Sequence, residues 1–147
     1  GRILSLDIGT KIIGVAMSDA LRIISNPKLS IKRISNKKDF ERIAKIIHDN
    51  EIELIVIGFP LNMDNTDSKM SEFVKRFSNE IDIFLKDIKI ILFDERLSSS
   101  YARDIIEENL PIKRTRNKKE LIDQIAASVI LQAFLDEMNF YKNNLKI

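Results

Sequence analysis

The chain has 147 residues, of which 44% are hydrophobic and 31% are charged, and its formal net charge is +2. These values fit a single globular domain with a sizeable core, and so small a net charge does not by itself indicate nucleic-acid binding. The absence of cysteine excludes disulfides and thiolate metal sites, and no stretch approaches the roughly 20 apolar residues of a membrane span. We therefore expect a cytoplasmic protein without membrane contact, with one domain over residues 1–141 and a short C-terminal tail at 142–147.

The first elements predicted along the chain are two strands, over residues 2–8 and 12–19. The short turn between them favours an antiparallel hairpin. A third, weaker strand is expected within residues 22–34. A helix follows over about 37–50, because apolar residues recur there at helical spacing.

The second half of the chain alternates buried strands with amphipathic helices. Residues 52–58 are almost all apolar and rich in β-branched side chains, as in a strand buried on both faces, and 88–93 form a second such run. An apolar stripe predicts a helix over about 67–86, Ser98 to Ser100 are N-cap candidates for another, and a long apolar helix is expected at roughly 118–141. The order predicts an α/β fold with a mixed five-stranded sheet, antiparallel in its first three strands and then parallel, with helices on both faces. This is the layout of a ribonuclease-H-like domain.

An acid, Asp7, ends the first predicted strand. Alternation places it on the same face as Ile3 and Ser5 and opposite to the leucines of the strand. A carboxylate there is costly to bury unless it is paired, hydrogen-bonded or bound to a metal. The alternative is a strand-end carboxylate that caps the turn amides, and this stretch alone does not decide between the two.

Two further acids, Asp94 and Glu95, follow the apolar run at 88–93. The carboxyl end of a buried strand is where open α/β sheets place their ligand sites. Alternation sends the two side chains to opposite faces, so only one of them is expected to serve a site. The alternative is that both are solvated, with Arg96 as an ion-pair partner.

A fourth acid, Asp123, lies in the last predicted helix. Its helical neighbours on the same face include Ala126, Ala127 and Ile130. The acid therefore lies on or beside the buried stripe, and the paired alanines allow the helix to approach the sheet closely. A carboxylate in that place is expensive to bury and indicates a function, whereas the alternative is a first-turn acid favoured by the helix dipole.

Asp7, Glu95 and Asp123 could converge on one edge of a mixed sheet. Carboxylate oxygens without His or Cys suit Mg²⁺ or Mn²⁺, and Asp94 is a further ligand candidate. Two such ions about 4 Å apart can activate a water and stabilise the leaving oxygen in phosphodiester hydrolysis. The three acids are therefore the predicted catalytic and metal-binding residues of a metal-dependent nuclease.

Four stretches of the chain resemble one known family. They read LDIGTKIIGVAMSD, IVIGFPLNMDNTDS, FDERLSSSYA and IDQIAASVILQAFLD. In this order and spacing they are similar to the YqgF/RuvX family of ribonuclease-H-like nucleases, known as pre-16S rRNA nucleases and Holliday junction resolvases. The resemblance implies that Asp7, Glu95 and Asp123 match the family's acids, and that Asp94 and Arg96 match the other members of its Asp-Glu-Arg motif.

Several positions depart from the family's pattern. Ile12 stands where the family usually has Arg, Phe59 is unusual at its position, Asn65 replaces a common Gly, and Ser98 and Ser99 replace threonines. None of these departures removes a carboxylate. They therefore bear on substrate contacts more than on the chemistry.

A basic segment, PIKRTRNKKE at residues 111–120, precedes the helix that bears Asp123. If this segment lies beside a metal site, its cations would bind the phosphate backbone of a nucleic acid. The alternative interpretation is that it is only a solvent-exposed connection between two elements. The loop after the 52–58 strand supplies Asn62, for which turn chemistry is the competing explanation. The expected nucleic-acid contacts are Lys11, Asn62, Arg96, Lys113, Arg114, Arg116, Lys118 and Lys119.

Three classes of function are compatible with these features. The first is a metal-dependent endonuclease. The resemblance implies 5′-end processing of pre-16S rRNA, with branched DNA as the alternative substrate. Resolution of a four-way DNA junction would favour a homodimer. The second is an ATPase, because Asp-Ile-Gly-Thr also looks like the first phosphate loop of actin/hexokinase-type enzymes, although those bind nucleotide between two such domains. The third is a nucleic-acid-binding module without catalysis, against which the retention of all three acids argues.

Overall fold

The computed structural model describes residues 1–62, 64–95 and 116–144, with the backbone alone for 116–119. Its elements are β1 (Arg2–Ile8), β2 (Ile12–Ser18), β3 (Ser25–Lys32), α1 (Asn36–Asp49), β4 (Ile52–Phe59), α2 (Lys69–Leu85), β5 (Lys89–Asp94) and α4 (Arg116–Asn144). Every strand and helix predicted within these ranges is present, with small shifts of the ends. The helix expected after Ser98 to Ser100 lies outside the described residues.

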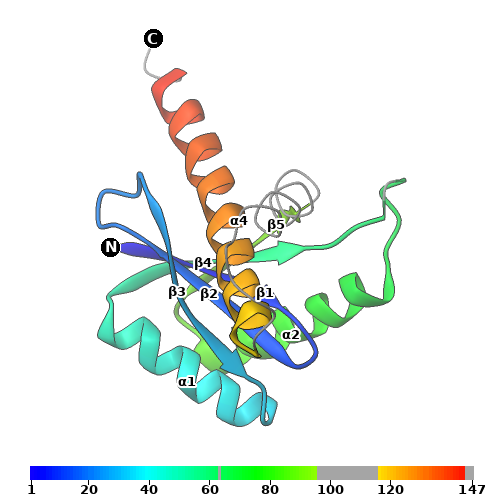
Figure 1. Cartoon of the computed structure of the whole chain (residues 1–147). Coiled ribbons are helices and arrows are strands. Elements are labelled where there is room, and N and C mark those ends of the chain that lie inside the picture. Colours follow the sequence, from blue (N-terminus) through cyan, green and yellow to red (C-terminus); the bar gives the residue numbers. More distant parts are fainter. Residues whose placement is uncertain (63, 96–115, 145–147) are drawn as a thin grey trace.

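The strands form one five-stranded sheet in the order β3-β2-β1-β4-β5 (Figure 1). β2 pairs antiparallel with both β1 and β3, whereas β4 runs parallel to β1 and β5 parallel to β4. The predicted mixed sheet is therefore confirmed. Because β1, β4 and β5 are parallel, their carboxyl ends meet at one edge of the sheet.

One face of the sheet is covered by α1 and α2. Alternation along β1 points Leu4 and Leu6 into this layer, where both are fully buried. Phe40 of α1 and Phe77 of α2 meet edge to face there, with 5.2 Å between their ring centroids. This larger core joins both helices to the sheet.

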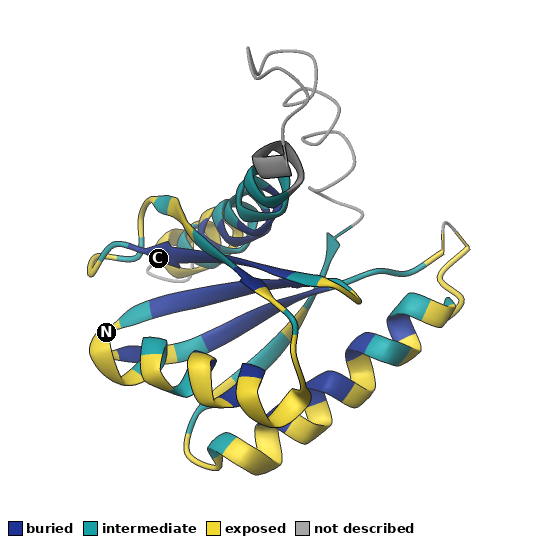
Figure 2. Ribbon diagram, turned by 60° about the horizontal axis from the view of Figure 1, so that its bottom comes forward, coloured by how far each residue is buried: buried dark blue, intermediate teal, exposed yellow. Residues whose placement is uncertain are grey.

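The opposite face carries α4, so that the buried strands lie between two helical layers (Figure 2). Ile3 and Ser5 of β1 face this layer and are fully buried, as their alternation predicts. The buried residues of this second core are Ile3, Ala16, Val56, Ala127, Ile130, Leu131 and Leu135. Helices therefore cover both faces, as the element order predicts.

The last helix, α4, is longer than the predicted 118–141. It runs from Arg116 to Asn144, so residues 142–144, which were expected in the tail, continue the helix. Its C-terminal turns extend past the sheet (Figure 1). No helix in the described part of the chain combines the length and apolarity that a membrane crossing requires.

Candidate active site

A cavity of about 370 Å³ lies where β1, β4 and β5 end. Asp7 from β1, Glu95 after β5 and Asp123 from α4 all line it. The rest of its described wall comes from residues 8–12 of the β1–β2 turn, the end of β4 and the start of α2. The structure thus brings together three acids that are far apart in the sequence.

Asp7 is the most enclosed of the three acids. It is buried, with 8% of its surface exposed, at the end of the central strand β1. It lies on the same face of β1 as Ile3 and Ser5, as alternation predicts, which is the face that α4 covers, and its partner in the β2 ladder is Gly14. Neighbouring strands flank β1 on both sides, so the sheet provides a rigid mount for this carboxylate.

Gly14 explains how α4 comes close to the sheet beside Asp7. A Cβ atom at Gly14 would lie 2.1 Å from the carbonyl oxygen of Asp123, a distance that no side chain can occupy. Next to Asp123, Ala126 and Ala127 are fully buried, in agreement with the predicted close approach. Because Gly14 pairs with Asp7, the same contact brings α4 at Asp123 against the sheet beside Asp7.

Gly58 leaves space for the side chain of Glu95 in a similar way. A Cβ atom at Gly58 would lie 2.9 Å from Oε2 of Glu95 and 2.7 Å from Cδ1 of Ile130. The glycine therefore leaves room for the Glu95 carboxylate on the α4 side of the sheet. Asp94 pairs with Phe59 in the ladder and is not part of the described cavity wall.

The described wall carries more negative than positive charge. Lys11, at the tip of the β1–β2 turn, is its one cationic side chain against the three carboxylates. The turn is held by hydrogen bonds from Gly9 N–H to the Ile12 carbonyl at 3.0 Å and from Arg33 N–H to the Lys11 carbonyl at 2.9 Å. Ile12 also lines the cavity and adds apolar surface to it. Such a wall attracts cations and repels phosphate until cations are bound.

The donor set suits a hard metal ion, although it is not a closed cage. In the part of the chain that the structure describes, no three His, Cys, Asp or Glu side chains are gathered tightly enough to hold a metal. Mg²⁺ commonly keeps several waters and is held by one or two carboxylates together with phosphate oxygens. Carboxylates spaced around an open cavity fit that mode of binding.

The loop from Pro60 to Ser68 borders the cavity, and Asn62 is used within it. The Asn62 side chain donates to Oγ1 of Thr66 at 3.0 Å, and its backbone N–H donates to the Thr66 carbonyl at 3.0 Å. Hydrogen bonds from the hydroxyl and the backbone N–H of Thr66 hold the pKa of the Asp64 carboxyl below its ordinary value. Asn62 is not in the described cavity wall, and turn chemistry accounts for these contacts.

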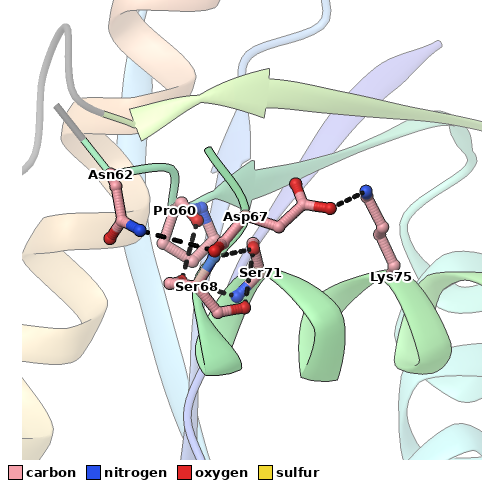
Figure 3. Close-up of polar contacts among 6 residues, drawn as sticks. All are labelled: Pro60, Asn62, Asp67, Ser68, Ser71 and Lys75. Carbon is pink, nitrogen blue, oxygen red and sulfur yellow. Dashed lines mark hydrogen bonds and ion pairs between the residues drawn. The ribbon is translucent and has the colours of Figure 1, made fainter. Parts of the chain in front are cut away.

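The end of this loop fixes the start of α2 (Figure 3). Ser68 and Ser71 form a capping box, in which Ser71 N–H donates to Oγ of Ser68 at 3.0 Å and Ser68 N–H donates to Oγ of Ser71 at 2.6 Å. Nζ of Lys75 lies 2.9 Å from Oδ2 of Asp67, which ties the loop to the helix. Met70, in the first turn of α2, is thereby held in the cavity wall.

The remaining predicted nucleic-acid contacts lie at or beyond the described residues. Arg96, Lys113 and Arg114 are outside them, and Arg116, Lys118 and Lys119 belong to the first turn of α4, where only the backbone is described. That turn precedes Asp123 on the helix. Their contacts with nucleic acid stay predictions.

Sequence reasoning missed the two glycines that shape the site. Gly58 ends a β-branched run, and Gly14 interrupts one. A glycine inside a strand pattern often marks a close backbone approach, and this signal could have indicated both positions.

Comparison with protein families gives one match along most of the chain. A family model described as "RuvX: Holliday junction resolvase" matches residues 1–137. A relative from Thermoanaerobacter pseudethanolicus, named "Putative pre-16S rRNA nuclease", is 44% identical over 135 residues, which are 92% of this chain and 96% of that protein. A relative of the same name from Endomicrobium trichonymphae is 38% identical over 135 residues, or 92% of this chain and 95% of the other.

Comparison with solved structures supports the fold. The RuvC protein of Thermus thermophilus in complex with a Holliday junction substrate gives a TM-score of 0.58 at 12% identity, over 93% of this chain and 95% of that one. A second structure of Thermus thermophilus RuvC gives 0.56 at 10% identity, over 95% and 97% of the two chains. At such identities the likeness establishes the shared fold alone.

Proposed function

The chain belongs to the RuvX family of Holliday junction resolvases and is a nuclease of the ribonuclease-H-like type, and on this basis we propose that Asp7, Glu95 and Asp123 form its catalytic site. The observation that carries the proposal is the shared cavity. Three carboxylates from three separate elements line it at the carboxyl edge of the sheet. Asp94, although adjacent to Glu95, is not assigned to the site.

The same three residues are the proposed ligands of Mg²⁺ or Mn²⁺, in a site for two ions. Held by these carboxylates, such ions would supply positive charge for the leaving oxygen and for activation of the attacking water. Asp7 is the carboxylate that the sheet orients most firmly, because it is buried at the end of a central strand. Glu95 and Asp123 line the same cavity from the end of β5 and from α4, and a phosphodiester backbone is proposed to enter it there.

Lys11 is the proposed phosphate contact within the cavity. It is exposed on a turn whose backbone is fixed on both sides, so the ammonium group can reach a phosphate beside the three acids. Lys113, Arg114, Arg116, Lys118 and Lys119 are proposed to continue this contact along the backbone of the nucleic acid. Arg96 and Asn62 complete the proposed set, with Asn62 acting through the shape of its loop.

The proposed substrate is the 5′ end of pre-16S rRNA in the cytoplasm, as in ribosome biogenesis. The relatives that match over nearly their whole length carry the name of this activity. Branched DNA is the second candidate, because the matching family is described as a Holliday junction resolvase. A four-way junction is two-fold symmetric, so that activity calls for a homodimer with two sites on opposed strands.

The experiment incubates the wild-type protein with precursor rRNA and with a synthetic four-way junction, in parallel, with Mg²⁺ or Mn²⁺ and again after chelation. The expected result is metal-dependent cleavage of the rRNA precursor, and loss of that cleavage on chelation. Cleavage of the junction alone, together with a dimer in solution, would transfer the assignment to the second substrate. Cleavage that continues unchanged in chelator would contradict the metal site.

A further inference from the structure

A buried hydroxyl joins the first strand of the sheet to the last helix. Ser5 of β1 is fully buried, and its Oγ donates a hydrogen bond of 2.7 Å to the carbonyl oxygen of Ala127, although 122 positions separate the two residues. A backbone carbonyl has two lone pairs, so Ala127 can accept this bond in addition to the bond within the helix. The sheet thus holds α4 through its backbone as well as through apolar packing.

The Ser5–Ala127 bond lies close to two of the proposed catalytic acids, Asp7 on β1 and Asp123 on α4. Asp7 follows Ser5 by two residues on the same face of β1, which spans about 6.6 Å in a strand. Asp123 precedes Ala127 by four residues on the same face of α4, which spans about 6.0 Å in a helix. The two rises are similar, and the carbonyl of Asp123 meets Gly14, the ladder partner of Asp7, so the Ser5–Ala127 bond restrains α4 close to the point where Asp123 lies beside Asp7.

Two other contacts restrain the same part of α4. Oγ of Ser30, on β3, donates to the carbonyl oxygen of Glu120 at 2.8 Å, three residues before Asp123. Gly14 admits the carbonyl of Asp123 itself. Asp123 therefore lies between two carbonyls that serine hydroxyls hold from the sheet.

We propose that Ser5 is a positioning residue for Asp123, and that its hydroxyl fixes the height of α4 on β1 so that the Asp7 and Asp123 carboxylates face one cavity. The inference rests on the proposed function in assigning these two acids to one site. Ser5 is fully buried and is not part of the described cavity wall. Its effect passes through the placement of α4.

The matched variants are Ser5→Ala and Ser18→Ala. Ser18, on β2, is also buried, with 3% exposed, and its hydroxyl accepts Ile3 N–H at 2.9 Å and donates to the Asp19 carbonyl at 2.9 Å. Each variant deletes one buried serine hydroxyl that bonds to the backbone, so both are expected to lower the unfolding midpoint to a similar extent. Only Ser5→Ala removes a bond to α4.

The first measurement is amide hydrogen exchange along α4 in the metal-free protein. Ser5→Ala is expected to speed exchange of the segment 120–127 about fivefold relative to wild type, while Ser18→Ala leaves it unchanged.

The second measurement is Mn²⁺ affinity by titration, with kcat and KM for the substrate that wild type cleaves. Ser5→Ala is expected to weaken Mn²⁺ binding and to lower kcat about tenfold while KM stays within twofold, because a small displacement of a catalytic group is costly.

The outcomes separate this inference from the proposed function. If wild type cleaves no nucleic acid, the proposed function fails, while the exchange measurement still decides whether Ser5 positions α4. If wild type cleaves and Ser5→Ala matches Ser18→Ala in exchange, Mn²⁺ affinity and kcat, the inference is overturned and the proposed function stands. Equal losses in both variants would likewise overturn it, because they would show a general effect of stability.

Discussion

At the scale of single residues, the site depends on two glycines as much as on its acids. Gly14 admits the backbone of α4 at Asp123, and Gly58 leaves space for the Glu95 carboxylate. A side chain at either position would collide with the group that it now accommodates. The arrangement of the three acids is therefore specified in part by residues that carry no chemistry.

The neighbouring pair Asp94 and Glu95 offers a direct test at this scale. Glu95→Gln is expected to lower metal-dependent cleavage by at least about 100-fold, because it removes a charged oxygen from the cavity wall. Asp94→Asn is expected to retain cleavage within a few-fold, because Asp94 lies outside that wall. Initial cleavage rates for both variants, at the same metal and substrate concentrations, make the measurement.

A strong loss in Asp94→Asn together with normal cleavage by Glu95→Gln would reverse the assignment. The two substitutions each exchange a carboxylate for its isosteric amide one residue apart. Because both substitutions remove the same charge from adjacent residues, unequal results would show which of the two carboxylates serves the cavity.

At the scale of secondary-structure elements, the sequence predicted the layers because strand and helix periods differ. Alternation placed Ile3 and Ser5 on one face of β1 and Leu4 and Leu6 on the other, and the structure confirms this division; which helix covers which face was found only in the structure. Alternation also sent Asp94 and Glu95 to opposite faces. It could not say which one joins Asp7, because that depends on how β5 is placed against β4 and α4.

Other features could not be read from local patterns. The length of α4 was underestimated because its last turns extend past the sheet and show no apolar stripe at their end. The link from Ser5 to Ala127 joins residues 122 positions apart, and only the folded chain brings them together. Single contacts of this kind, unlike the meeting of the three acids, could therefore not be predicted from local patterns.

An ion pair between Arg33, which directly follows β3, and Asp39 of α1 lies on the face of the sheet away from the site. Nε of Arg33 donates to Oδ2 of Asp39 at 3.1 Å, and Ile34 N–H donates to Oδ1 of the same carboxylate at 3.1 Å. The Arg33 guanidinium also lies over the rings of Phe73 and Phe77, at 5.5 and 5.3 Å from their centroids. The Asp39 side chain is fully buried and that of Arg33 is 11% exposed.

Breaking this pair should cost far more stability than breaking an exposed one. Asp39→Ala is expected to lower the free energy of unfolding by about 3 kcal/mol, because it removes a fully buried carboxylate that accepts hydrogen bonds from the Arg33 guanidinium and from Ile34 N–H. Asp67→Ala, which removes the exposed pair with Lys75, is expected to lower it by less than about 1 kcal/mol. Urea unfolding followed by circular dichroism measures both, and equal effects would contradict the burial argument.

At the scale of the whole molecule, the fold separates stability from chemistry. The larger core lies under α1 and α2, whereas the acids lie on the other face, between the sheet edge and α4. The cavity wall is net negative over its described part, with Lys11 as its cation. A phosphodiester therefore gains from bound divalent cations there, which agrees with the proposed metal-dependent cleavage.

Asp7 is the carboxylate around which the proposed catalytic metal site is built. The most direct test of this role compares cleavage by wild type, Asp7→Asn and the control Asp82→Asn, an exposed acid on α2. We expect Asp7→Asn to lose Mg²⁺- or Mn²⁺-dependent cleavage by at least about 100-fold while its fold and its affinity for the nucleic acid stay close to wild type, and Asp82→Asn to cleave normally. Cleavage by Asp7→Asn at the wild-type rate would contradict the account.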